Sequence, residues 1–176
     1  VDKAARYIGG EVKSVMKKDE DGNIDPNVKG RVAFDFPDVY EIGMSNLGMM
    51  LLYNMFNERE DVWCERVFSP WMDLDKVMRE KNIPLFALES QDPIRQFDFL
   101  CITLGYEMCY TNVLQTLDLS HIPLLAKDRD DSCPIVVGGG ACAYNPEPLA
   151  AFFDLFYIGE GETVYDALFD AYKANK

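Results

Sequence analysis

The chain has 176 residues, of which 48% are hydrophobic and 12% aromatic, enough apolar material for one globular core. Its formal net charge of −13 argues against direct nucleic-acid binding, because the domain would repel phosphate groups. No apolar run approaches the roughly 18 residues needed to cross a bilayer. The five cysteines are scattered and histidine occurs once, so we expect free thiols, a cytoplasmic location, no membrane partner and no protein-ligated metal.

The first 30 residues are predicted to form an N-terminal arm or lead-in outside the core. Basic side chains are in excess at its start, where Lys3, Arg6, Lys13, Lys17 and Lys18 outnumber Asp2 and Glu11. A charge run of this kind is typical of a solvated segment. The globular domain is therefore expected to span residues 31–176.

The first half of that domain predicts alternating strands and helices. In chain order these are a strand over 32–36, a helix capped by Ser45 or Asn46, a strand over 62–68, a helix opened by Ser69-Pro70, and a brief edge strand over 85–88. The first helix is expected to bury one stripe at helical spacing, formed by Leu47, Met50, Leu51, Asn54 and Met55.

The second half continues the alternation. Residues 97–104 are the most continuous hydrophobic run and predict a central strand that is covered on both faces. The following elements are a helix over 109–120, a strand over 134–137, a short helix over 148–153, a strand over 155–158, and a closing helix that Thr163 begins. This order predicts an α/β fold with a doubly wound, mainly parallel sheet of five or six strands and helices on both faces, flavodoxin-like or Rossmann-like.

Ligands of an open parallel sheet bind beyond the carboxyl ends of its strands. The loops to consider are therefore those over 37–46, 105–109, 138–145 and 159–162. Three consecutive glycines over 138–140 remove every Cβ from one strand end, so a flat or bulky group can approach the backbone there. The alternative is that these glycines only form a tight turn.

Several motifs, in order along nearly the whole chain, resemble a known family. They read YIGGE (7–11), FPDVYEIGMS (36–45), ERVFSPW (65–71), YEMCYTN (106–112) and NPEP (145–148). They are similar to the amino-terminal portion of a bacterial family of cobalamin-binding-type radical SAM proteins. The resemblance implies a cobalamin domain followed, in the parent protein, by a radical SAM barrel that uses S-adenosylmethionine and a 4Fe-4S cluster. The Cys-x-x-x-Cys-x-x-Cys motif of that barrel is absent, so this chain alone is not expected to be catalytic, and the barrel is its expected partner.

The resemblance also implies which residues would contact cobalamin. They belong to three loops: Asp38, Tyr40, Gly43 and Ser45; Thr103, Leu104, Gly105, Tyr106 and Glu107; and Gly138, Gly139 and Gly140. Many cobalamin domains carry Asp-x-His-x-x-Gly after the first strand, whereas this chain has Tyr40 where the cobalt-binding His would lie. A neutral phenol is a poor ligand, and His121 is expected at the opposite edge of the sheet. Two hypotheses follow: cobalamin held base-off without a His ligand, or a non-binding scaffold that shapes the barrel and its substrate access.

Three other functions fit the sequence less well. A dinucleotide site would need Gly-x-Gly-x-x-Gly after the first strand, and the carboxylates of Gly159-Glu160-Gly161-Glu162 would repel phosphate. A phospho-receiver would need an Asp where Thr103-Leu104-Gly105 ends the central strand. A hydrolase lacks a Ser-His or Cys-His pair. Glu41, Glu107 and Glu160 could form an acid/base group on neighbouring loops. We favour the interpretation that they accept hydrogen bonds from loop amides or lie at helix N-termini.

Overall fold

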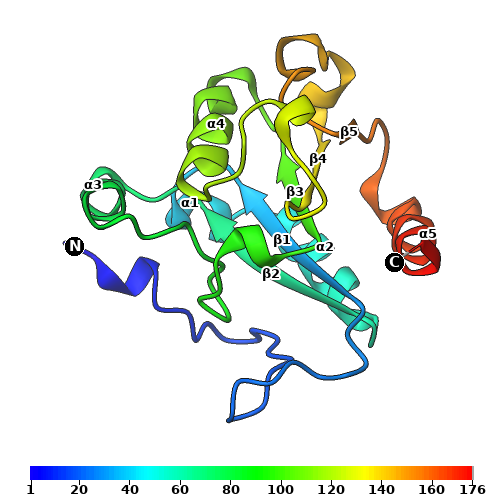
Figure 1. Cartoon of the computed structure of the whole chain (residues 1–176), viewed down its shortest axis with the longest axis horizontal. Helices are drawn as coiled ribbons and strands as arrows, with labels where there is room; N and C mark the ends of the chain where they lie inside the picture. Colours follow the sequence, from blue (N-terminus) through cyan, green and yellow to red (C-terminus); the bar gives the residue numbers. More distant parts are fainter. Residues whose placement is uncertain (176) are drawn as a thin grey trace.

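Five parallel strands form one sheet in the order β2-β1-β3-β4-β5 in the computed structural model, which describes residues 1–175. The strands are β1 (Gly30–Phe36), β2 (Val62–Phe68), β3 (Phe99–Thr103), β4 (Ile135–Gly139) and β5 (Leu155–Phe156). The chain proceeds from β1 to β2 on one side and then returns to place β3 on the other side (Figure 1). The prediction of a doubly wound α/β fold is confirmed, and its topological switch point lies between β1 and β3.

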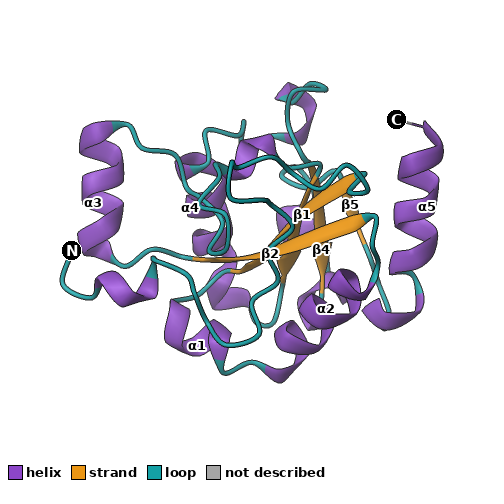
Figure 2. Ribbon diagram, turned by 90° about the horizontal axis from the view of Figure 1, so that it is seen from below, coloured by secondary structure: helices purple, strands orange, loops and turns teal. Residues whose placement is uncertain are grey.

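Helices cover both faces of this sheet. The α-helices are α1 (Tyr40–Met44), α2 (Leu47–Glu58), α3 (Met72–Lys81), α4 (Tyr110–Leu119) and α5 (Tyr165–Asn175). Short 3-10 helices are η1 (Ala4–Arg6), η2 (Ile94–Gln96), η3 (Glu107–Cys109), η4 (Ala126–Asp128), η5 (Ala141–Tyr144), η6 (Glu147–Leu149) and η7 (Gly161–Thr163). Figure 2 shows α3 and α4 on one side of the sheet and α1 and α2 on the other. No helix in the described part of the chain is long and apolar enough to cross a membrane.

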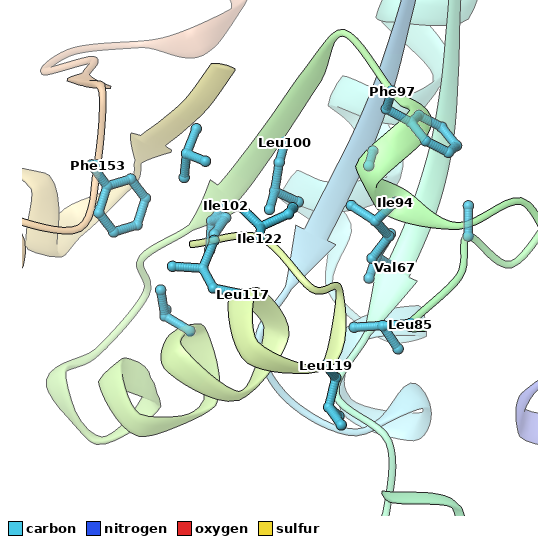
Figure 3. Packing of buried hydrophobic residues seen from close by; sticks show 14 of the residues in the cluster. Val67, Leu85, Ile94, Phe97, Leu100, Ile102, Leu117, Leu119, Ile122 and Phe153 are labelled. Atoms are coloured by element: carbon cyan, nitrogen blue, oxygen red, sulfur yellow. The ribbon is translucent and has the colours of Figure 1, made fainter. Parts of the chain in front are cut away.

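Side-chain alternation along the strands builds a separate core on each face. Leu100 and Ile102 of β3 pack toward Leu117 of α4 in one core, as Figure 3 shows. Phe99, which precedes Leu100, faces the other way and meets Phe169 of α5 with ring centroids 5.6 Å apart. The central strand is therefore buried on both faces, as its continuous hydrophobic sequence predicted.

The predicted apolar stripe of α2 is wrong. Asn46 does cap the helix, since its side chain accepts a hydrogen bond from the Met49 backbone N–H at 2.9 Å. The buried residues are Met49, Tyr53 and Phe56, whereas Leu47 is exposed. Residues 47–56 are apolar on nearly every side, so periodicity alone did not identify the face that meets the sheet.

The predicted edge strand over 85–88 is also wrong. Phe86 forms an isolated antiparallel bridge with Pro93. The Leu88 N–H donates one hydrogen bond to the β2 backbone, at the Arg66 carbonyl, over 2.8 Å. Gln91, with a φ of 63°, turns the chain back before a ladder can form.

Three other predicted boundaries shift. Helix α3 begins at Met72 with Trp71 as its N-cap, two residues after the predicted Ser69-Pro70 start. The predicted short helix over 148–153 is limited to η6, and the predicted strand over 155–158 to β5. Thr163 does not cap α5, because its hydroxyl donates to the Glu160 carbonyl within η7.

The N-terminal arm lies against β2 and α2. Trp63 Nε1 donates to the Val15 carbonyl at 3.1 Å, and the Val15 N–H donates to the Tyr53 hydroxyl at 2.7 Å. Lys17 donates to three backbone carbonyls at the end of α2 and the start of β2, and Lys18 pairs with Asp92 at 2.7 Å. These two lysines are partly buried and bonded, contrary to the expectation of a solvated segment, although Lys3 and Lys13 are exposed.

Candidate functional site

The loops after β1, β3, β4 and β5 meet at one edge of the sheet, because all five strands run in the same direction. These loops contain α1, η3, η5 and η7, respectively. The residues predicted to bind a ligand lie in the first three loops or at the strand ends that precede them. The structure divides this edge into an apolar cavity and a crevice that is closed by hydrogen bonds.

The apolar cavity has a volume of about 280 Å³ and lies between the sheet, α2 and α5. Its inner wall is apolar and half of its residues are aromatic; it is formed by Phe34, Cys101, Val137, Leu52, Phe56, Tyr165, Leu168 and Phe169. Its mouth is formed by strand ends and by the β5 loop, at Thr103, Gly139, Gly140, Tyr157, Gly159, Glu160, Gly161 and Glu162. An apolar wall with a few polar groups at the rim is the usual composition of a small-molecule site.

The three glycines at the end of β4 differ in what a Cβ atom at each position would contact. A Cβ at Gly138 would lie 2.8 Å from the Phe156 ring, so this glycine serves packing. Gly140 has a φ of +102°, and a Cβ there would lie 2.9 Å from the Leu104 carbonyl oxygen, so it serves the turn. Gly139 lines the cavity, and a Cβ there would meet no atom within 4 Å. The tight turn and the open floor are therefore both present, at neighbouring residues.

The crevice at the switch point, above β1 and β3, is bridged by polar contacts. The Tyr106 hydroxyl donates to Asp38 Oδ2 at 2.7 Å, and Asn112 Nδ2 donates to the Pro37 carbonyl at 2.9 Å. The Ser69 N–H also donates to the Asp38 carbonyl at 2.9 Å, which ties the same loop to the end of β2. The bond to the Asp38 carboxylate raises the pKa of Tyr106 to about 12, so the phenol stays neutral and remains a donor.

Tyr40 lies on the β2 side of the edge, away from the cavity. Its hydroxyl donates to Glu11 Oε1 of the N-terminal arm at 3.1 Å, and its ring packs edge-on against Phe68. Burial, and then the bond to the Glu11 carboxylate, raise the pKa of Tyr40 above its usual value. Gly43 lies directly against the Phe68 ring, and the Ser45 hydroxyl donates to the Ile42 carbonyl at 2.8 Å.

The predicted site residues therefore separate into groups. Thr103, Gly139 and Gly140 line the cavity, whereas the β1-loop set of Asp38, Tyr40, Gly43 and Ser45 does not. Leu104 is buried in the core below η3 and Gly138 packs within the sheet, while Gly105, Tyr106 and Glu107 are exposed in the β3 loop. No cluster of three His, Cys, Asp or Glu side chains suited to a metal ion occurs among residues 1–175.

Sequence reasoning missed the aromatic wall of the cavity. Phe56 of α2 and Tyr165 and Phe169 of α5 come from opposite ends of the domain, and their ring centroids lie 5.1 to 6.1 Å apart. The pairing of α5 with α2 carries no sequence signal. A larger polar cavity of about 780 Å³ lies at the opposite edge, where Arg95 and Arg129 are already bonded to backbone carbonyls.

A buried carboxyl lies below the crevice. Asp35 of β1 is fully buried, and only one of its oxygens has a partner, the Thr116 hydroxyl of α4 at 3.0 Å. Burial raises the pKa of Asp35 to about 7, because an ionised carboxylate loses its hydration there. Because its second oxygen has no partner among the described residues, ionisation of Asp35 would destabilise the folded domain.

Comparison with known proteins adds two findings. Residues 48–176 match the family described as radical SAM proteins, N-terminal. An uncharacterized protein of Methanocaldococcus jannaschii is 31% identical over 132 residues, which is 74% of this chain. The same alignment covers 24% of that protein, so the chain spans about a quarter of its relative's length.

Proposed function

We propose, since the chain belongs to the family of radical SAM protein N-terminal domains, that it binds cobalamin for a radical SAM enzyme. The family implies S-adenosylmethionine and a 4Fe-4S cluster in the remainder of the parent protein. The function proposed for this chain is to hold the cofactor over the carboxyl edge of its sheet. The observation that carries the proposal is the apolar cavity behind Gly139.

The cavity fits one part of the cofactor rather than the whole. Small-molecule sites usually span roughly 300 to 1,000 Å³, and this cavity of about 280 Å³ lies at the lower limit. Its aromatic wall suits the flat heterocycle of the nucleotide tail, which would enter past Thr103 and Gly139. The large corrin ring would remain outside, over the strand ends.

Each residue at the cavity mouth has a different role in the proposed binding. The missing Cβ of Gly139 leaves space for the tail to pass close to the β4 backbone. The Thr103 hydroxyl offers one hydrogen bond at the entrance, and Glu160 and Glu162 make the rim unsuitable for a free polyphosphate. These features favour a large cofactor whose tail ends in an uncharged heterocycle over a dinucleotide with its charged pyrophosphate.

The residues do not fit a His-ligated cobalt. Tyr40, at the position of the His in other cobalamin domains, is bonded to Glu11 and packed against Phe68. His121 follows the end of α4 and is exposed at the far edge of the sheet. We therefore propose a base-off form without a protein ligand below the metal. Bound cobalamin would supply methyl-transfer or related radical chemistry to the barrel.

The proposal is tested by titrating the purified chain with hydroxocobalamin and following the corrin absorbance. We expect a saturable spectral shift, and we expect the Tyr40→Ala variant to retain most of the affinity, because Tyr40 lies outside the cavity. The absence of any shift at tens of micromolar protein would contradict cobalamin binding. A complete loss of binding in Tyr40→Ala would contradict the unligated form while leaving the cofactor itself in place.

A further inference from the structure

Large apolar side chains are exposed in the loops of the carboxyl edge. Met108 after β3 is 84% exposed, Leu47 after β1 is 79% exposed, and Tyr144 after β4 is 72% exposed. Ile42 and Ile158, from the β1 and β5 loops, are each at least half exposed. We define these five side chains as the apolar rim. Four separate loops contribute to it, so it is a shared property of this edge rather than of one segment.

The opposite edge of the sheet differs. Apart from the N-terminal arm, where Met16 is 51% exposed, its large apolar residues Ile83, Leu124 and Leu155 are 36 to 40% exposed. Ile83 and Leu124 follow the ends of α3 and α4, and Leu155 begins β5. Scattered apolar exposure of this degree is ordinary on a soluble surface, whereas a contiguous group of larger values marks an interaction site. The difference between the two edges points to a partner at the carboxyl edge.

Carboxylates lie among the members of the apolar rim. Glu41, Glu107, Glu147, Glu160 and Glu162 are all exposed in the same loops. Arg6 of the arm pairs with Glu41 at 2.8 Å, with Lys3 as a second cation nearby, and neither reaches the other four carboxylates. A complementary surface would therefore be apolar at its centre and basic around it. A second copy of this acidic chain, with its own carboxylates, would be repelled.

We propose that the apolar rim is the docking surface for the domain that follows this one in the same polypeptide. The chain matches only 24% of the length of its relative, so most of that protein lies outside this domain. Tethering raises the effective concentration of the following domain, so a modest apolar patch is enough to hold it. The cavity mouth lies in the β4 and β5 loops, next to Tyr144 and Ile158 in sequence, so docking at the rim would cover it. This inference rests on the family and not on the cofactor.

Hydrogen exchange, measured by mass spectrometry without added cobalamin, compares the 176-residue chain with the full-length parent. We expect exchange of the segments over 42–47, 105–109 and 141–145 to slow at least about tenfold in the parent. The double variant Met108→Ser, Tyr144→Ser in the parent should restore fast exchange. The matched control Ile83→Ser, Leu124→Ser should not.

Several outcomes would overturn the inference. Equal exchange of these segments in the chain and the parent would exclude docking at this edge. Sedimentation that shows a dimer of the chain, lost in the double variant, would assign the rim to a second copy instead. Protection that arises only when hydroxocobalamin is added would assign it to the cofactor. Because the main comparison uses no cobalamin, failure of the cofactor proposal leaves this test intact.

Discussion

The two ends of the sheet are built in opposite ways. At β2, charged groups are buried and paired: Arg66 is fully buried and donates to Glu89 at 2.6 Å, while its guanidinium lies over the Tyr53 ring. Arg31 likewise pairs with the buried Glu65. The N-terminal arm covers this end of the sheet. At β4 and β5 the ion pair between Arg129 and Asp154 is partly exposed, and this end has glycines, a two-residue edge strand and an apolar cavity.

The two ends of the sheet contribute to different properties, one to stability and the other to binding. Buried charge pairs that have lost their hydration stabilise only one arrangement, because either partner alone would be costly to bury. They therefore fix the β2 end in one conformation. The β4 end has less side-chain packing along its edge strand and leaves space that a ligand can fill. We infer that the β2 end supports the domain and that the β4 end serves the cofactor.

The largest expected effect on stability is at the β2 end. Replacing Glu89 by Ala leaves the Arg66 guanidinium buried without its carboxylate, so we expect the free energy of unfolding to fall by about 3 to 5 kcal/mol. Guanidinium chloride denaturation measures it. The matched control Asp166→Ala removes an exposed partner of Arg59 and should cost less than about 1 kcal/mol. Equal losses in both variants would show that the buried pair stabilises the β2 end no more than an exposed pair does.

Asp35 provides a pH-dependent test at the boundary between the two ends. The unfolded chain ionises this carboxyl near its usual value of 3.8, whereas the folded chain does so at about 7. Between these values the folded state holds the extra proton, so the Asp35 contribution to stability falls as pH rises. Removing the carboxyl with Asp35→Asn should therefore stabilise the protein relative to wild type, increasingly from pH 4 to pH 8, by about 4 kcal/mol at most.

Thermal unfolding at several pH values measures this difference. The control is Asp131→Asn, at an exposed acid, which should differ from wild type by a constant amount across the range. A difference curve for Asp35→Asn that is flat, or that falls with pH, would show that the buried carboxyl is ionised in the folded protein.

The smallest expected effect is at the crevice. Tyr106→Phe removes one exposed hydrogen bond to Asp38, so global stability should change by no more than about 1 kcal/mol. Exchange of backbone amides over 105–109 should nevertheless become faster, because that bond ties the β3 loop to the β1 loop. Tyr144→Phe, at an exposed tyrosine of the β4 loop, is the control. Unchanged exchange in Tyr106→Phe would show that the crevice is closed by packing alone.

Much of the fold could be predicted from the sequence. The run over 97–104 identified the central parallel strand, because a strand covered on both faces is apolar along nearly its whole length. The strand over 62–68 was also predicted, although Glu65 and Arg66 interrupt its apolar residues. The same logic failed for the segment over 85–88, where one backbone bond to Arg66 precedes a turn at Gln91. It failed for α2 as well, where apolar residues surround the helix.

The site was only partly predictable. Consecutive glycines located the cavity mouth, since a missing Cβ is visible in the sequence. The bond between Tyr106 and Asp38 joins residues 68 positions apart, and the aromatic wall joins α2 to α5. Such contacts depend on how the chain returns on itself, which local patterns do not encode. The resemblance of the loop around Tyr40 to a metal-binding motif likewise gave no sign that Glu11 would engage it.

The central claim is that the cofactor enters behind Gly139, and one measurement tests it most directly. A calorimetric titration with hydroxocobalamin compares wild type with two variants. Gly139→Val fills the cavity mouth. Gly30→Val is the control, because a Cβ at Gly30 also meets no atom within 4 Å but lies at the start of β1. We predict that Gly139→Val weakens binding at least about 100-fold, the loss expected when an apolar group of this size loses its site. Gly30→Val should bind like wild type. Binding by Gly139→Val equal to that of wild type would contradict the account.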